Sequence, residues 1–291
     1  MTSSPASPTA RRLRLGMELQ RLREAAGVDR NEAAKAIDTS YSTISRIETG
    51  KTGIRLSDLR ALLDLYGVTD QGYRQGLEEL SREGRQQGWW SRHASILNRA
   101  YSTYIGLEQA ATRLLAYESS VIHGLLQTED YALDLLRQAK EPEDVTRQRV
   151  KVRMERQKRL IPGDDDTPAV RLWAILDESA ILRQVGGPDV MIAQLKRLIE
   201  AASAQNVTLQ VLPFEAGAHP AVNGPFSVIE MPEEYGTLVY IEGLAGDIYV
   251  EGTDVVRYTL AFDELRAAAL APNASVERIE RAIAALQARR S

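Results

Sequence analysis

The chain has 291 residues, of which 44% are apolar and 26% are charged, a composition typical of a soluble globular protein with roughly two domains. It has no cysteine, which excludes disulfides, zinc–thiolate sites and thiol nucleophiles, and its three histidines leave little for a metal site. No apolar run approaches the ~20 residues of a membrane span. Residues 1–10 are rich in Ser and Pro and predict a disordered tail rather than a signal peptide, so a cytoplasmic protein is expected.

The formal net charge of −4 is unevenly distributed along the chain. Residues 1–70 carry +2, residues 71–160 carry +3 and residues 161–291 carry −9. A mildly basic front half suits a protein that gains affinity for nucleic acid by pairing two copies. It suits a strong non-specific binder less well.

Five short helices are predicted in residues 11–80. Leucines recur at helical spacing in the first helix, and a glycine follows it. Asp29, Ser40 and Ser57 are suitable N-caps for the second, third and fourth helices, because their side-chain oxygens can accept a backbone N–H at the helix start. The sequence therefore predicts a compact all-α domain here.

The third helix lies within T-S-Y-S-T-I-S-R-I-E-T-G, residues 39–50, and has two different faces. Ile44 and Ile47 are one turn apart and can face a core. The other side carries short polar groups and one long cation, the types that reach base edges and phosphates in a major groove. These residues are Tyr41, Ser42, Ser45 and Arg46. Taken alone, the pattern is also that of an ordinary capped surface helix.

Residues 12–70 resemble the Xre/phage-repressor helix-turn-helix family, and the motif S-x-x-x-I-S-R-I-E-x-G-K at residues 40–51 is close to the family pattern. The resemblance implies a DNA reader in which Ser40 caps the recognition helix and Lys51 reaches a phosphate. The DNA-contacting residues that it implies are Arg30, Ser40, Tyr41, Ser42, Thr43, Ser45, Arg46 and Lys51.

Two positions of the resembling segment, Arg30 and Glu48, are expected to have roles other than direct base contact. The family often has Gln at the first residue of the second helix, where this chain has Arg30. A phosphate contact is still expected there, whereas the support that Gln gives to the recognition helix is lost. Glu48 is expected to form an internal pair that braces the fold.

Residues 81–165 are predicted to form a mostly helical connector. Trp89 and Trp90 follow a polar helix, and Tyr101 and Tyr104 come soon after. Such aromatic residues either anchor one domain against another or form the wall of a ligand or partner site.

A highly charged helix over residues 143–160 is expected to be a solvated connector or a dimer helix. The segment I-P-G-D-D-D-T-P, residues 161–168, then marks the predicted domain boundary. Its three consecutive aspartates are expected to be solvated and not to hold a cation.

Residues 166–291 are predicted to form an α+β domain, because strand-like and helix-like patterns alternate in them. The expected strands lie at 170–176, 207–214, 226–231, 237–242 and 247–250, and the expected helices at 190–202, 253–270 and 275–288. The segment contains no G-x-S-x-G motif and no phosphate-binding loop. His219 is either a base or ligand contact without an obvious partner or a structural residue. We therefore expect neither an enzyme nor a cofactor.

Several phrases of the second half resemble a large actinobacterial regulator family with a conserved antitoxin-like C-terminal domain. They include G-L-L-Q-T-E-D-Y-A, I-L-D-E-S-A-I-L-R and L-Q-V-L-P-F-E-A-G-A-H. The resemblance implies a sequence-specific transcriptional regulator, a homodimer that binds double-stranded DNA and a small acidic or amphipathic partner protein encoded nearby. The alternative is a regulator whose C-terminal domain senses a small molecule. The residues expected in the partner or ligand site are Trp89, Trp90, Tyr101, Tyr104, His219 and Phe226.

Overall fold

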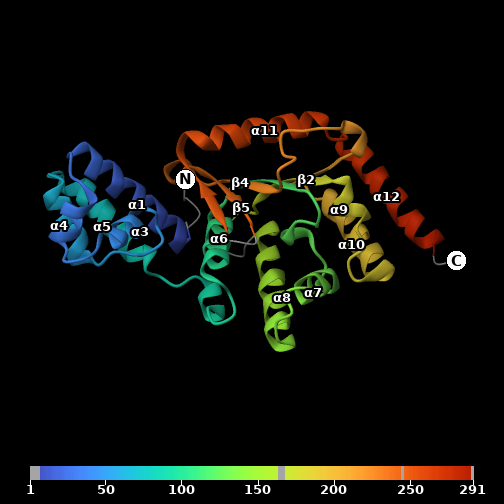
Figure 1. Cartoon of the computed structure of the whole chain (residues 1–291), viewed down its shortest axis with the longest axis horizontal. Coiled ribbons are helices and arrows are strands. Elements are labelled where there is room, and N and C mark those ends of the chain that lie inside the picture. The colour runs from blue at the N-terminus through green and yellow to red at the C-terminus, as the bar shows by residue number, and fades with distance from the viewer. Residues whose placement is uncertain (1–6, 163–167, 244–245, 290–291) are drawn as a thin grey trace. The chain divides into compact units, whose positions relative to one another are not determined.

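The computed structural model describes residues 7–162, 168–243 and 246–289, and Figure 1 shows their helices and strands. These residues divide into two compact units. The first unit consists of the chain up to Arg92 together with residues 105–110 and 232–235. The second unit contains residues 93–104, 111–231 and the chain from Gly236 onward. The expected aspartate-rich boundary at 164–166 lies outside the described residues.

The first unit contains the five short helices that the sequence predicts. They are α1 (Pro8–Ala25), α2 (Arg30–Ala36), α3 (Tyr41–Glu48), α4 (Leu56–Leu65) and α5 (Gln71–Gly84). Leu19, Ile44 and Leu59 are among the residues that form their shared core. The all-α architecture of the first unit is therefore as expected from the periodicity.

Two helix starts differ from the prediction. α1 begins at Pro8, inside the expected disordered tail, because Ser7 caps it by accepting a hydrogen bond from the backbone of Ala10, 3.2 Å away. α4 begins at Leu56 after Arg55, with no side-chain cap. The hydroxyl of Ser57 instead donates to the side chain of Asp58, 3.0 Å away, so the prediction of a Ser57 cap is wrong.

The second unit is built on a six-stranded mixed sheet with the strand order β3-β2-β1-β4-β5-β6. The strands are β1 (Arg113–Glu118), β2 (Arg171–Asp177), β3 (Val207–Leu212), β4 (Phe226–Glu230), β5 (Thr237–Ile241) and β6 (Ile248–Val250). Neighbours among β1, β2 and β3 are parallel, whereas the pairs from β1 through β4 and β5 to β6 are antiparallel. The α+β fold class and the β4–β5 hairpin are confirmed.

β1 corrects the expected organisation, because it lies in residues predicted to be a helical connector and yet sits between β2 and β4. Its central residues L-L-A-Y are all buried, so they show no alternation of apolar and polar residues. A short buried strand of this kind cannot be distinguished from a buried helix by periodicity alone. The mixed unit thus includes residues well before 166.

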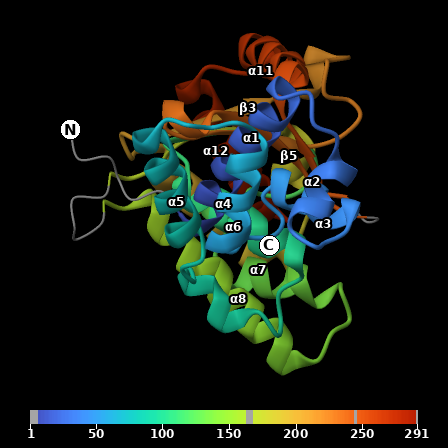
Figure 2. The same ribbon diagram turned by 90° about the vertical axis from the view of Figure 1, so that its left-hand side faces the viewer.

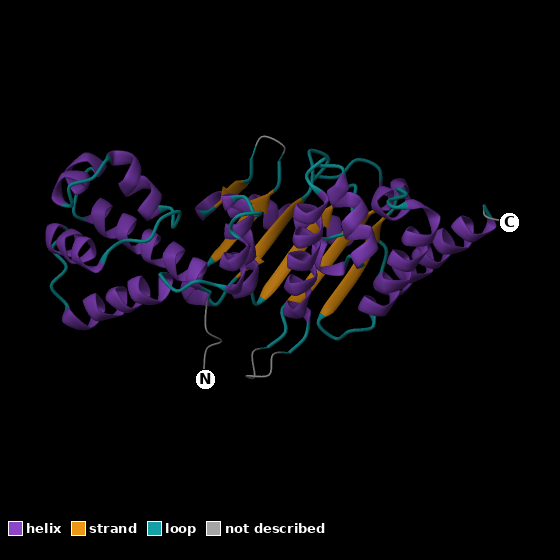
Figure 3. Cartoon of the chain, turned by 90° about the horizontal axis from the view of Figure 1, so that it is seen from below, coloured by secondary structure: helices purple, strands orange, loops and turns teal. Residues whose placement is uncertain are grey.

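Helices cover both faces of this sheet. In Figures 1 and 2, α11 lies on one side of the strands and α7 and α8 lie on the other, and Figure 3 shows helices crossing the strands from below. The helices that lie wholly in the second unit are α7 (Glu129–Arg137), α8 (Glu143–Gln157), α9 (Glu178–Leu182), α10 (Gly187–Ala202), α11 (Val255–Ala268) and α12 (Pro272–Ala288). The residues of α6 (Arg99–Ala110) are divided between the two units. Short 3-10 turns lie at Trp89–His93, Gly124–Leu126, Lys158–Leu160, Phe214–Ala216, Glu233–Tyr235 and Gly252–Asp254.

Candidate functional site

The start of α3 is fixed by a group of hydroxyls. Ser40 has an extended backbone and its Oγ accepts a hydrogen bond from the backbone N–H of Thr43, 3.2 Å away. The same oxygen lies 2.9 Å from Ser42 Oγ and 3.0 Å from Thr43 Oγ1. The expected capping role of Ser40 is confirmed, and three hydroxyls gather at the exposed first turn of the helix.

α3 presents the two faces that its sequence predicts. Ile44 and Ile47 are buried in the core of the first unit. Tyr41 is 50% exposed, and Ser42 and Arg46 are exposed as well. The guanidinium of Arg46 has no hydrogen-bond or ion-pair partner among the residues that the structure describes. This helix therefore offers a polar face whose one long cation is available to a ligand.

The remaining predicted contacts of this face are less uniform in exposure. Thr43 and Ser45 are half-buried, and Lys51 is exposed in the turn that follows α3. Since Thr43 is engaged with Ser40, its hydroxyl supports the helix start. Ser42, Ser45 and Arg46 are three or four residues apart or adjacent and share one side of α3, whereas Lys51 lies beyond its end.

A buried ion-pair cluster fixes the other end of α3. The carboxylate of Glu48 is almost completely buried, and it accepts a hydrogen bond from Arg23 Nε at 2.5 Å and from Arg30 Nε at 2.7 Å. The bond to Glu48 raises the pKa of Arg23 above its ordinary value. The expected internal pair of Glu48 is therefore present, and it joins the C-terminal end of α3 to α1 and α2.

Arg30 has a second role besides the phosphate contact that the resemblance implies. Its Nη1 lies 3.4 Å from the hydroxyl of Tyr41, and its guanidinium carbon lies 5.8 Å from the centre of the Tyr41 ring. Arg30 thus connects Glu48 to the first residue of α3. Arg30 therefore supports the recognition helix, so the expected loss of support from the absence of Gln at this position is wrong.

α1 packs directly on the end of α3 because Gly16 has no side chain. A Cβ at residue 16 would lie 2.4 Å from the carbonyl oxygen of Glu48 and 2.5 Å from that of Ile47. Gly50 makes a similar approach to the backbone of Leu13, and its φ of 63° is left-handed. These two glycines set the distance between α1 and the recognition helix.

Trp89 and Trp90 belong to the first unit. Trp90 is 7% exposed and meets Trp89 edge-on, with 5.9 Å between their ring centres. A Cβ added at Gly106 would lie 2.9 Å from the Trp90 ring. Trp89 Nε1 lies 3.4 Å from Gln109 Oε1. Trp90 is therefore a packing residue of the first unit and Trp89 lies half-buried beside it, while the interdomain anchor and the ligand wall both stay predictions.

Tyr101 and Tyr104 lie in the second unit, where they meet an arginine and another tyrosine. The guanidinium carbon of Arg156 lies 5.2 Å from the Tyr101 ring centre and 5.1 Å from that of Tyr104. Arg156 also donates a hydrogen bond to the Tyr101 hydroxyl. The buried Tyr104 ring in turn lies 4.2 Å from the ring of Tyr240.

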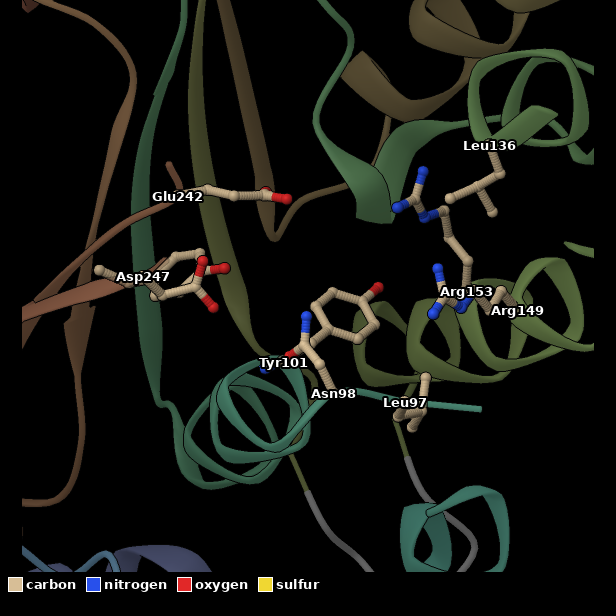
Figure 4. A pocket seen from close by; sticks show the side chains of 9 residues that line it. Leu97, Asn98, Tyr101, Leu136, Arg149, Arg153, Glu242 and Asp247 are labelled. Carbon is tan, nitrogen blue, oxygen red and sulfur yellow. Dashed lines mark hydrogen bonds between the residues drawn. The ribbon is translucent and has the colours of Figure 1, made fainter. Parts of the chain in front are cut away.

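Of these side chains, Tyr101 and Tyr240 border a pocket of the second unit with a cavity of about 110 Å³. Figure 4 shows its charges on opposite sides, with Glu242 and Asp247 facing Arg149 and Arg153 across Tyr101. The residues that line the pocket are Leu97, Asn98, Tyr101, Leu136, Arg149, Arg153, Tyr240, Glu242 and Asp247. Only Tyr101 of the expected ligand residues lines it.

The arginines of α8 are not predicted as site residues from the sequence, because the charged helix over residues 143–160 is expected to be a solvated connector or a dimer helix. Arg149, Arg153 and Arg156 are four and three residues apart, which places them on one face of a helix. Arg156 is buried. This spacing indicates a basic helix face. The acidic residues between the arginines make the same segment also typical of a solvated helix.

His219 and Phe226 lie near Tyr117, and none of the three lines the pocket. His219 Nε2 lies 3.3 Å from the Tyr117 hydroxyl, and the Tyr117 ring centre lies 6.3 Å from that of Phe226. Burial, together with the charge of Asp177 and a hydrogen bond to it, raises the pKa of Tyr117. Successive side chains of a strand point to opposite faces, so the side chains of Tyr117 and its neighbour Glu118 lie on different faces of the sheet.

The chain belongs to the family described as a domain of unknown function, DUF5753, whose model matches residues 101–281. A helix-turn-helix domain model matches residues 14–74, which include α3 and its supporting cluster. The protein is therefore a DNA-binding regulator of the helix-turn-helix class. No curated protein and no solved structure matches it.

Two further findings concern the described residues. None of the helices described combines the length and apolar character needed to cross a membrane. In the same part of the chain, no group of three or more His, Asp or Glu side chains is placed to hold a metal ion.

Proposed function

We propose that the protein is a sequence-specific transcriptional regulator that binds double-stranded DNA as a homodimer. The observation that carries this proposal is the exposed polar face of α3, with Arg46 unpartnered among the described residues and the buried side fixed by Glu48. A single short helix reads few base pairs, so a second copy would extend the site. Paired recognition helices of this class enter major grooves roughly 34 Å apart.

The test of base reading is the variant Arg46→Ala, measured on a binding site selected from random DNA. An arginine that bonds a base edge is worth about 1–3 kcal/mol of discrimination, so affinity falls and preference relaxes at one position of the site. Arg82→Ala is the matched control, because Arg82 is an exposed arginine of the same unit on α5. An equal loss on every sequence would assign Arg46 to phosphate.

The proposal of a homodimer has a separate test in the mass of the protein alone and bound to its selected site. A dimer predicts a palindromic site with half-sites about one helical turn apart. A single protein chain on a site without internal symmetry would contradict it.

We further propose that the second unit binds a small partner protein in an antitoxin-like system and carries no catalytic activity of its own. The support is the resemblance of several phrases of the second half to regulators with such partners. Co-expression with the small protein encoded beside the gene provides the test. A stable complex with altered DNA affinity supports the proposal. Absence of a complex argues against it.

A second candidate function is a regulator whose second unit senses a small molecule. The pocket between α8 and the strand end at Tyr240 favours it. This pocket replaces the one expected from the aromatic residues, of which only Tyr101 takes part. The two candidate functions differ in what changes DNA affinity, a protein or a small molecule.

A further inference from the structure

The pocket of the second unit separates its charges. Glu242 is exposed and Asp247 is partly exposed, and both lie on one side of the cavity. Arg149 and Arg153 lie on the opposite side, with Tyr101 between the two sides (Figure 4). A ligand that spans this cavity meets negative charge at one end and positive charge at the other.

The two arginines differ in how fully they are engaged. Arg149 is committed to the protein, because its Nε donates to the carbonyl of Ile96 at 2.8 Å and its Nη1 pairs with Glu141 at 2.6 Å. Arg153 donates Nη1 to Gln127 at 2.9 Å, while its Nε is buried without a partner among the described residues. That Nε is closed off from solvent, whereas the other terminal nitrogen, Nη2, bonds no described residue, so Arg153 is the arginine of this pocket with a donor left for an anion.

Tyr240 supplies a second unsatisfied group in the wall of the pocket. Its side chain is 5% exposed, and its hydroxyl has no hydrogen-bond partner among the described residues. Burying an unpaired hydroxyl costs free energy, so such a group calls for an explanation. The hydroxyl is closed off from solvent in the ligand-free protein, so a ligand that bonds it must displace part of the wall of the adjoining cavity.

The size of the cavity limits the part of a ligand that it holds. A closed engineered cavity of about 150 Å³ holds a benzene molecule, so this open cavity of about 110 Å³ holds a group of only a few heavy atoms, and the rest of a ligand can extend toward solvent. A small anion alone would face Glu242 and Asp247, and a small cation alone would leave Arg153 without a counter-charge.

We propose that this pocket binds a small zwitterion, a free α-amino acid or a close chemical relative. Its carboxylate bonds Arg153, and its ammonium group lies between Glu242 and Asp247 beside the Tyr240 hydroxyl. This proposal rests on the sensor function proposed for the second unit and specifies the chemical class of its ligand.

The carboxyl of Glu118, a residue of intermediate exposure at the end of β1, fits this arrangement. Burial and the nearby charge of Glu242 raise the pKa of Glu118 to about 8, against the opposing influence of Arg153 and Arg156. Glu118 is thus mostly neutral at pH 7. Its neutral form leaves the charge of Arg153 free to attract the carboxylate of the ligand.

The experiment measures binding to the full-length protein without DNA, by thermal unfolding and then by calorimetry. The probes are the common α-amino acids, tested singly. For the best of them, the amine that lacks its carboxylate and the acid that lacks its amino group are also tested. At least one amino acid is expected to raise the unfolding temperature. Each half-molecule is expected to bind about tenfold more weakly or worse, since it loses one charge-assisted contact.

Two variants place the ligand in the pocket. Arg153→Gln and Glu242→Gln should each weaken binding by about tenfold or more, and Glu242 is exposed, so its substitution leaves the fold intact. Arg147→Gln is the matched control on α8, because Arg147 is exposed, pairs with Glu143 and does not line the cavity.

The proposal is overturned if no amino acid shifts the unfolding temperature. It is also overturned if the amine or the acid alone binds as well as the zwitterion, or if both pocket variants bind like the wild type. Because no DNA is present, any of these results leaves the proposal of DNA reading by Arg46 untouched.

Discussion

In the first unit, the buried carboxylate of Glu48 accepts hydrogen bonds from Arg23 and Arg30, so acid and bases are partnered at close range. In the second unit, Glu118 is influenced by Glu242 and Arg153 through charge. The first arrangement joins α1 and α2 to the C-terminal end of α3. The second surrounds a cavity and leaves donor groups unpaired.

This difference indicates which polar groups serve the fold and which are available for binding. A buried charge whose hydrogen bonds are all made holds the elements around it in place. Removing one partner leaves the other charge buried and unpaired, which costs free energy of unfolding. A buried donor without a partner costs stability until a ligand supplies the acceptor. Substitutions in the two units should therefore change stability in different ways, and the following predictions test that contrast.

The largest expected effect is that of Glu48→Ala. It removes the buried carboxylate that Arg23 and Arg30 share and leaves Arg23 with only the exposed Glu24 as a carboxylate partner, which should cost about 3–5 kcal/mol of the free energy of unfolding of the first unit. Hydrogen exchange of the amides in α1, α2 and α3 provides a local measurement. Glu78→Ala is the control in the same unit, because Glu78 pairs with the exposed Arg60 and its loss should matter little. Equal effects of the two substitutions would contradict a special role for the buried cluster.

The next largest effect is expected from Gly16→Ala, which places a Cβ 2.4 Å from a backbone oxygen at the end of α3. Since that backbone cannot move without disturbing the Glu48 cluster, we expect a loss of about 3 kcal/mol and weaker DNA binding. Gly76→Ala on α5 is the matched control, because no atom lies within 4 Å of a Cβ there and alanine favours a helix. Stability of Gly16→Ala equal to that of the wild type would show that α1 can shift away from α3.

The sequence predicted the first unit well because its helices are determined by local features. Ser40 caps α3, Ile44 and Ile47 bury one side and Gly50 ends the helix, and all these signals lie within a dozen residues. The failure at Ser57 is also instructive, since a capping residue type does not ensure a cap. The neighbouring Asp58 accepts the hydroxyl hydrogen bond instead.

The pocket could not be predicted in the same way, because its residues are far apart in the sequence. Tyr101, Arg153 and Glu242 come together only when β1 lies inside the sheet, and the apolar run of β1 gives no periodic signal. For Trp89 and Trp90, residue type alone left open an anchor between domains or the wall of a site, because composition does not indicate which neighbour an indole meets. The two indoles contact each other within the first unit.

A moderate effect of pH is expected from Glu118, whose pKa burial raises to about 8 in the folded protein. A raised pKa means that the folded state holds the proton more tightly than the unfolded state. This group therefore costs no stability below about pH 4, and its cost grows as pH rises to about 8. Allowing for the partial exposure of Glu118, we expect the free energy of unfolding to fall by about 1–3 kcal/mol between pH 5 and 8.

Glu118→Gln should remove that dependence, because glutamine does not ionise. Denaturant unfolding at pH 5, 6, 7 and 8 measures it as the difference between the wild type and the variant, with the variant gaining relative stability as pH rises. Glu143→Gln is the control, because Glu143 is exposed beside Arg137. A constant difference between wild type and Glu118→Gln across this range would contradict the raised pKa.

The smallest expected effect is also the sharpest test of the contrast, because it predicts opposite signs for two tyrosines of one sheet. Tyr240→Phe removes a buried hydroxyl without a partner among the described residues and keeps the ring packed on Tyr104, so it should stabilise the ligand-free protein by about 1 kcal/mol. Tyr117→Phe removes a hydroxyl that contacts His219 and should destabilise it by a similar amount, about 1 kcal/mol. Denaturant unfolding of both variants measures the two changes. If Tyr240→Phe loses as much stability as Tyr117→Phe, the Tyr240 hydroxyl has a partner in solution and the pocket is not a site of unsatisfied donors.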